Sequence, residues 1–119
     1  MADQDRDNML ELDTLLGRGA SFVGRLTFDG RTRVDGHLVG EVFSDGVLVL
    51  GESADVEATI EVKVLIVRGA TLRGNVRATE SIEVYAPARV YGSLAAPEVV
   101  IERGSVIEGS VHMGPLELA

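Results

Sequence analysis

A five-residue pattern returns at nearly constant spacing along most of the chain, and this repeat restricts the fold more than any other feature of the sequence. In the copy from Leu72 to Val76, the first, third and fifth residues are apolar or glycine, and the second and fourth are polar. Such alternation is typical of a strand with one buried and one solvated face. The middle residues of six copies lie 16, 18, 16, 18 and 17 positions apart; they are Gly24, Gly40, Ala58, Gly74, Gly92 and Gly109.

A second series of apolar residues runs between the copies of the first. Its members are pairs separated by one residue, and each pair lies 17 positions after the last. Two strand series that share one period indicate that the chain coils and lays each strand against its equivalent one turn away. We therefore expect an all-β fold, a single-stranded parallel β-helix (β-solenoid) of about six coils. The pairs are Leu48 and Leu50, Leu65 and Val67, Ile82 and Val84, and Val99 and Ile101, and Thr32 and Val34 would extend the series one turn earlier.

Small residues and outward charges agree with this coil. Small residues follow the pairs at matching places and predict the bends, because backbone meets backbone there at the distance between strands. Stacking by one turn would also place Glu57 beside Arg73 and Glu61 beside Arg77. Opposite charges on neighbouring strands indicate the register of those strands. The small residues at the predicted bends are Ala54, Ala70, Ala88 and Ser105.

The repeat divides the chain into three segments. Residues 1–17 are expected to form an acidic flexible leader, residues 18–113 a β-helical polymerisation domain, and residues 114–119 a short C-terminal tail. The leader carries half of the net charge of −8. It also contains leucines at loosely helical spacing, which could dock on a partner or a membrane: Leu10, Leu12, Leu15 and Leu16.

Composition and motifs argue against catalysis, cofactors and nucleic acid as functions. The chain has no cysteine, and its two histidines, His37 and His112, are expected four coils apart, too far to share a metal ion. It contains neither a Gly-Lys-Ser/Thr phosphate loop nor a Gly-x-Ser-x-Gly elbow. Its acidity disfavours phosphate backbones. No export signal or apolar run of 18 residues is present. We therefore predict no catalytic, cofactor-binding or metal-binding residues, and a cytoplasmic location.

The ends of a solenoid present open strand edges and an apolar cross-section, which together form a template for another chain. We expect end-to-end stacking through these ends. If like ends meet, two isologous contacts alternate and the filament is non-polar; if unlike ends meet, it is polar. The predicted polymerisation interface consists of Phe22, Leu26 and Phe28 in the first coil and Ile107, Val111 and Met113 in the last.

Three stretches of the sequence resemble the bactofilins, a family of bacterial cytoskeletal proteins. They run from Arg33 to Val42, from Leu72 to Ala78 and from Val99 to Gly104, and the resemblance extends over residues 14–113. It implies a right-handed β-helix, which is also the hand expected of parallel crossovers, flanked by short disordered tails.

The same resemblance implies a function and a set of partners. It implies nucleotide-independent, non-polar filaments that act as scaffolds for cell-shape, wall-synthesis or chromosome-segregation machinery. The partners would be copies of the chain, related bactofilin chains and proteins of that machinery. Many members also attach peripherally to the inner membrane through an apolar N-terminal segment; here residues 1–5 are acidic and polar, which disfavours anionic lipid.

Two other functions remain open from the sequence. One is a monomeric β-helical adaptor whose leader recruits a partner while the rod acts as a spacer. The other is an enzyme of the left-handed β-helix type, such as an acyltransferase or a carbonic anhydrase. Such enzymes typically have tight hexapeptide repeats and catalytic or zinc-binding histidines. In this chain, by contrast, the period varies between 16 and 18 residues.

Overall fold

The computed structural model describes residues 13–113, and within that range every regular element is a β-strand. Two of the predicted docking residues, Leu10 and Leu12, lie outside the described residues. The strands are β1 (Asp13–Leu16), β2 (Ser21–Phe28), β3 (Arg31–Val34), β4 (His37–Ser44), β5 (Val47–Leu50), β6 (Asp55–Arg68), β7 (Thr71–Tyr85), β8 (Arg89–Ala96), β9 (Glu98–Ile101) and β10 (Val106–Met113).

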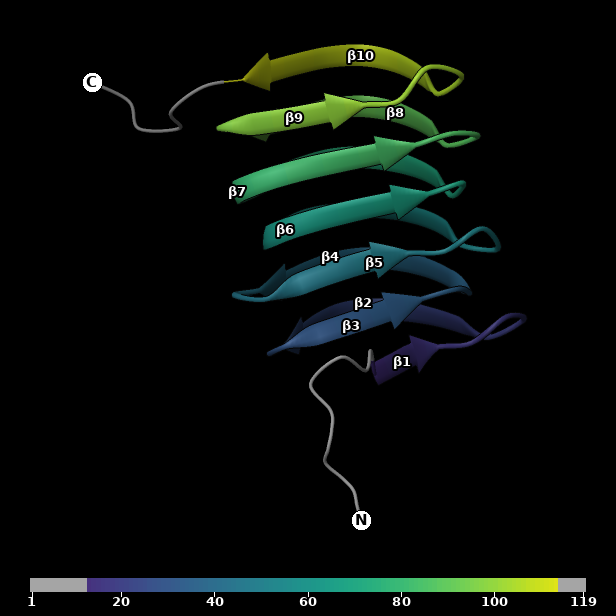
Figure 1. Ribbon diagram of the computed structural model, residues 1–119. Coiled ribbons are helices and arrows are strands. Elements are labelled where there is room, and N and C mark those ends of the chain that lie inside the picture. The colour runs from purple at the N-terminus through teal and green to yellow at the C-terminus, as the bar shows by residue number, and fades with distance from the viewer. Residues whose placement is uncertain (1–12, 114–119) are drawn as a thin grey trace.

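The strands of residues 13–113 stack in two faces along one continuous coil (Figure 1). The short-strand face contains β1, β3, β5, the C-terminal halves of β6 and β7, and β9. The long-strand face contains β2, β4, the N-terminal halves of β6 and β7, β8 and β10. All of these pairings are parallel, and five stacking steps connect the six layers of each face. The predicted β-solenoid is thus confirmed.

The direction of the chain in Figure 1 gives the hand of the coil. The short strands run from left to right in front, and the chain returns behind them while it rises toward the C-terminus. This path is right-handed, as parallel crossovers favour. Tight turns join the two faces on the right of the view, and β6 and β7 each bend from the long-strand face into the short-strand face without interruption.

The observed register matches the period of the sequence. Gly40 pairs with Gly24 on one side and with Ala58 on the other, and the same column continues through Gly74 to Gly92. In the second series, the pairs that begin at residues 48, 65, 82 and 99 stack on one another. Parallel strands lie about 4.8 Å apart, so one repeat of sequence corresponds to one step along the axis.

The core is a narrow stack of aliphatic side chains between the two faces. Leu38, Val56, Leu72 and Val90 occupy one column in register, and each is completely buried. Full burial of such a side chain stabilises the fold by about 1.5–3 kcal/mol. The predicted bends contain buried small residues, as expected, at Ala54, Ala70 and Ala88.

Glu57 lies opposite Arg73, and Glu61 lies opposite Arg77, which confirms the register inferred from their charges. The ion pair that Arg73 forms within the described residues is nevertheless with Asp55, at 3.4 Å from Nη1 to Oδ1. Both side chains are about half exposed, so this pair contributes little to stability.

Strand β1 extends the solenoid to Asp13, five residues before the predicted start of the β-helical domain. Thr14 pairs with Arg33, and Leu16 pairs with Val34. Leu16, one of the predicted docking residues, therefore belongs to the backbone ladder of the first layer, and Leu15, another, lies at the register shift between Thr14 and Leu16.

The glycine column fulfils a steric requirement of close stacking. Gly92 has φ 135°, a conformation that side chains other than glycine rarely adopt. A Cβ atom at this position would also meet the carbonyl oxygen of Gly74 in the layer below. At Gly92, therefore, only glycine combines this backbone angle with this stacking distance.

We predict that Gly92→Ala lowers the free energy of unfolding by at least about 1–3 kcal/mol, because it imposes strain at positive φ in addition to the clash. Chemical denaturation monitored by circular dichroism would measure the loss. Gly17→Ala is the control, since a Cβ there meets nothing within 4 Å; it should change stability by less than about 0.5 kcal/mol. Equal effects of the two substitutions would contradict the steric argument.

Candidate assembly surfaces

Each end of the described solenoid leaves two strands with a neighbour on one side only. At the N-terminal end, β1 pairs with β3 and β2 pairs with β4; at the C-terminal end, β9 pairs with β7 and β10 pairs with β8. Within residues 13–113, the other edge of each of these strands has no strand partner. Such an edge presents a row of N–H and C=O groups that can pair with another chain.

The N-terminal end carries the three residues predicted from the sequence. Phe22, Leu26 and Phe28 occupy alternate positions of β2, are half-buried and pack against the core. In the next layer Phe22 faces Leu38 and Leu26 faces Val42, both completely buried. The first coil therefore continues the apolar columns of the core up to the open edge.

The C-terminal end carries the other three predicted residues, and two of them are well exposed. Val111 is 40 % exposed although its partner in the layer below, Leu94, is 1 % exposed. Met113 is 58 % exposed above the fully buried Ala96. Ile107 is half-buried and packs against the core. These columns are interrupted only because the described solenoid has no further layer.

Three further exposed apolar residues at this end lie outside the predicted interface. Val100 and Ile101 lie in β9 and are 48 % and 41 % exposed, and Val106 begins β10 and is 41 % exposed. Ile101 is the last member of the second strand series, above the buried Val84, so its place in the repeat could have revealed it. Val106 stacks on the exposed Arg89, and its position in the repeat predicts only a solvated residue.

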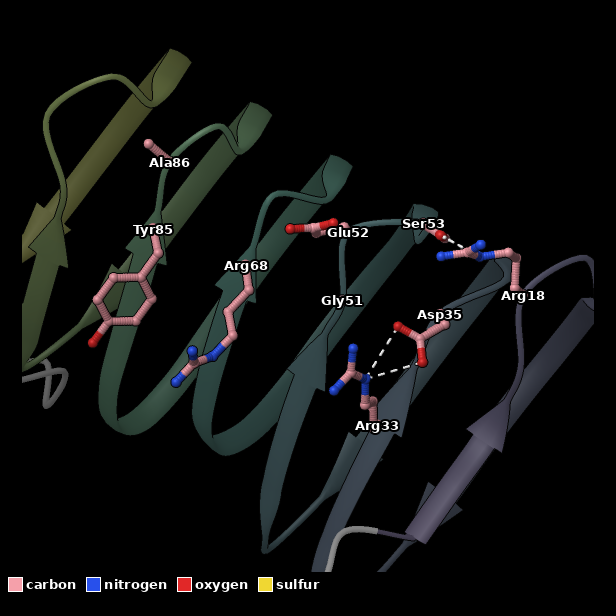
Figure 2. Close-up of a pocket in the computed structure, with 9 residues that line it drawn as sticks. All are labelled: Arg18, Arg33, Asp35, Gly51, Glu52, Ser53, Arg68, Tyr85 and Ala86. Atoms are coloured by element: carbon pink, nitrogen blue, oxygen red, sulfur yellow. Dashed lines mark hydrogen bonds and ion pairs between the residues drawn. The ribbon is translucent and has the colours of Figure 1, made fainter.

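A separate cavity of about 470 Å³ opens on the corner between β-strands of the short-strand face and the turns that follow them (Figure 2). Arg33 donates from Nε to the carboxylate of Asp35 at 2.9 and 3.1 Å. Arg18 donates from Nε to Ser53 Oγ at 3.0 Å. The first contact lies within one coil and the second connects turns two coils apart, so the polar groups pair with each other in a charged corner rather than in a catalytic arrangement.

Tyr85 lies at the far end of this cavity, where Arg68 lies over its ring at 5.3 Å from the centroid (Figure 2). The Tyr85 hydroxyl donates to Glu83 Oε1 at 2.5 Å. This hydrogen bond to a carboxylate raises the pKa of Tyr85 above its ordinary value, because losing the proton would place two negative charges together.

The two histidines lie in β4 and β10, four layers apart, as the sequence predicted. His37 Nδ1 is 3.9 Å from Asp55 Oδ2, on the exposed long-strand face. Within residues 13–113, no three potential ligands among His, Cys, Asp and Glu gather in a way that could hold a metal ion. The described part of the chain also contains no helix with the length and apolarity needed to cross a bilayer.

We predict that Glu83→Gln lowers the pKa of Tyr85 toward the ordinary tyrosine value, because the neutral amide does not repel the phenolate. Titration of the phenolate absorbance, in a Tyr91→Phe background so that Tyr85 titrates alone, would measure the shift. The chain contains two tyrosines, which makes this background sufficient. An unchanged midpoint would show that Glu83 does not act on the phenol.

Comparison with known proteins adds evidence on the family. A family model described as "Bactofilin: Polymer-forming cytoskeletal" matches residues 14–112. Bactofilin BacP of Myxococcus xanthus strain DK1622 is 37 % identical over 105 residues, which are 88 % of this chain and 43 % of BacP. Bactofilin BacO of the same strain is 28 % identical over 109 residues, 92 % of this chain and 86 % of BacO. No solved structure matches the chain significantly.

Proposed function

This chain belongs to the bactofilin family of polymer-forming cytoskeletal proteins, and we propose that its two open ends join copies of it into filaments without a nucleotide. The observation that supports this most is the interruption of the core columns at the last coil. Val111 continues a column in which Leu94 and Val76 are almost completely buried. A second chain at this end would remove its exposed apolar surface from water at about 25 cal/mol per Å².

Burial of the ends could supply the energy of assembly by itself. The sequence contains no phosphate-binding loop of the Gly-Lys-Ser/Thr type. Backbone groups on the open edges of β2 and β10 would gain strand partners at the same time as apolar side chains leave water. Nucleotide hydrolysis has no part in this assembly.

The proposed filament is non-polar, with like ends in contact. Phe22, Leu26 and Phe28 would then meet their own copies across one two-fold axis, and Ile107, Val111 and Met113 would meet theirs across another. The resemblance to bactofilins favours this arrangement over a head-to-tail polymer. The two arrangements predict different products when one end is blocked.

The filament would serve in the cytoplasm as a scaffold that positions machinery for cell shape, wall synthesis or chromosome segregation. The chain spans less than half the length of BacP, so the clients of that protein need not be those of this chain. A partner would dock on the residues before β1, among which Leu10 and Leu12 are apolar. An attachment to the inner membrane through the same residues is the second possibility for this segment.

We predict that Val111→Arg abolishes filaments, because the contact would bury a charge against an apolar surface. Negative-stain electron microscopy and light scattering without nucleotide would measure the effect. A non-polar filament should fall apart into dimers of about 25 kDa, twice the 12.7 kDa of the chain, because the N-terminal contact remains. A polar filament should fall apart into monomers.

Thr59→Arg is the matched control for this substitution, since it adds the same charge to an exposed position on the long-strand face. It should leave the filaments intact. Filaments that survive Val111→Arg would exclude Val111 from the interface, and loss of filaments in the control would show that added charge alone prevents assembly.

We also predict that deletion of residues 1–12, which leaves β1 in place, preserves filament formation. The open edges and apolar ends within residues 13–113 are unchanged by this deletion. Light scattering and electron microscopy of the shortened chain would measure assembly. A monodisperse small species would favour the adaptor, in which the leader rather than the ends makes the functional contact.

A further inference from the structure

The outer surface of the short-strand face has an apolar centre. The runs Val47–Leu50 and Val64–Val67 each contain four consecutive apolar residues, so these strands are apolar on both sides. Leu48 and Leu65 point into the core and are completely buried. The alternate residues form the outer apolar cluster, which consists of Val47, Val49, Val64 and Ile66.

Stacking makes this cluster flat and dense. Val49 pairs with Ile66 and Val47 pairs with Val64 in neighbouring layers. Val49 is only 4 % exposed although it is not part of the core cluster, and the other three are half-buried. The exposed part of the cluster therefore belongs to Val47, Val64 and Ile66, while Val49 is almost completely covered.

The long-strand face differs in how its charges are arranged. There, opposite charges in adjacent layers form ion pairs. Arg25 Nε lies 3.8 Å from Glu41 Oε1, and Arg73 Nη1 lies 3.4 Å from Asp55 Oδ1. Arg25 also lies over the ring of Phe43 at 4.6 Å from its centroid. This face neutralises its own charges and has the character of a solvated surface.

On the short-strand face, Arg33 and Glu83 flank the outer apolar cluster from different layers, and Arg33 also forms an ion pair with the neighbouring Asp35. Arg33 precedes the cluster in β3, and Glu83 follows it in β7, in one stacked column with Val49 and Ile66 between them. In the neighbouring column Arg31 precedes the cluster, and Ser81 and then Glu98 follow it. The first column thus runs from Arg33 through Val49 and Ile66 to Glu83 and ends at the exposed Val100, so a positive and a negative residue flank its apolar centre.

From this arrangement we infer that the short-strand face binds the short-strand face of a second copy, with the two solenoid axes antiparallel. The two-fold axis would run along the strands, between β5 and the C-terminal half of β6. Val49 would then lie against Ile66 of the second copy, and Arg33 against Glu83 of the second copy, each contact occurring twice. Such a contact is isologous and complementary in charge.

The side chains of the charged pair are oriented suitably for this contact. Asp35 binds Arg33 through Nε, and a guanidinium group has further donors on its two terminal nitrogens. Glu83 accepts the hydrogen bond from Tyr85 at Oε1, and a carboxylate has two acceptor oxygens. Both groups can therefore keep their own partner and meet the opposite charge of the second copy.

The size of the face determines when it binds. Six layers at about 4.8 Å, four residues wide at about 3.3 Å, give on the order of 400 Å² per copy. A stable interface between two proteins usually buries about 800 Å² per partner. Single subunits should therefore remain unpaired through this face, whereas filaments, which carry it many times, should pair side by side. The inference rests on the proposed filament and adds its lateral contact.

The test compares filament width and filament length by negative-stain electron microscopy at low salt. Wild-type filaments should lie in pairs or bundles, and these should separate at high salt as the charges are screened. Glu83→Arg should give single filaments of normal length, because it faces Arg33 of the second copy. The double variant Arg33→Glu, Glu83→Arg should restore pairing, since the charges are exchanged on both sides of the two-fold axis.

Glu57→Arg is the matched control, because it makes the same change of charge on the long-strand face; its filaments should stay paired. Ile66→Lys is a second disrupting variant at the centre of the face and should also give single filaments. Thermal unfolding confirms that each variant is folded.

Three results would overturn the lateral contact alone: single wild-type filaments at low salt, paired filaments of both Glu83→Arg and Ile66→Lys, or a folded, filament-forming double variant that stays single. Absence of any wild-type filament would overturn the proposed function together with the lateral contact.

Discussion

The parallel backbone ladder between successive coils is the interaction on which the whole structure depends. Neighbouring strands lie about 4.8 Å apart, and at Gly92 the positive φ would direct a Cβ atom into the carbonyl oxygen of Gly74 in the layer below. The ladder also sets each inward side chain above its equivalent, so the core is a set of apolar columns rather than a globular interior. Leu72 above Val56 is one example, and both are completely buried.

The same ladder explains why the ends and faces of this rod have different chemistry. Along the axis, a column of buried residues stops only where a layer is missing, so the last member is apolar and exposed, as Val111 is. Around the axis, the charged residues of an outer column can either pair with opposite charges in adjacent layers or be separated by apolar residues. Arg25 and Glu41 on the long-strand face illustrate the first case. On the short-strand face, Val49 and Ile66 separate Arg33 from Glu83 within their column, and Arg33 pairs with Asp35 instead. The proposed filament would therefore grow at the ends, and the proposed lateral contact would use one face.

Much of the candidate site could be predicted because it follows from the period. A repeat near 17 residues placed Phe22 and Val111 in the first and last layers, and the structure has them there with the expected inward columns. The exposed Val106 and the outer apolar cluster around Val49 did not follow so easily. Alternation marks one face of a strand as core, and a run of four apolar residues does not say whether its second face is covered by the same chain or by another.

The sequence by itself determined the β-solenoid, its register and the position of the two ends, because stacking equivalent residues is the one arrangement that turns a linear period into a continuous core. Only the tertiary structure decided that Asp13–Leu16 joins the ladder as the first layer and that Arg73 meets Asp55 although Glu57 lies beside it in register. These outcomes depend on side-chain reach and on the edge that β3 leaves open. Both arise from three-dimensional geometry, for which the repeat has no signal.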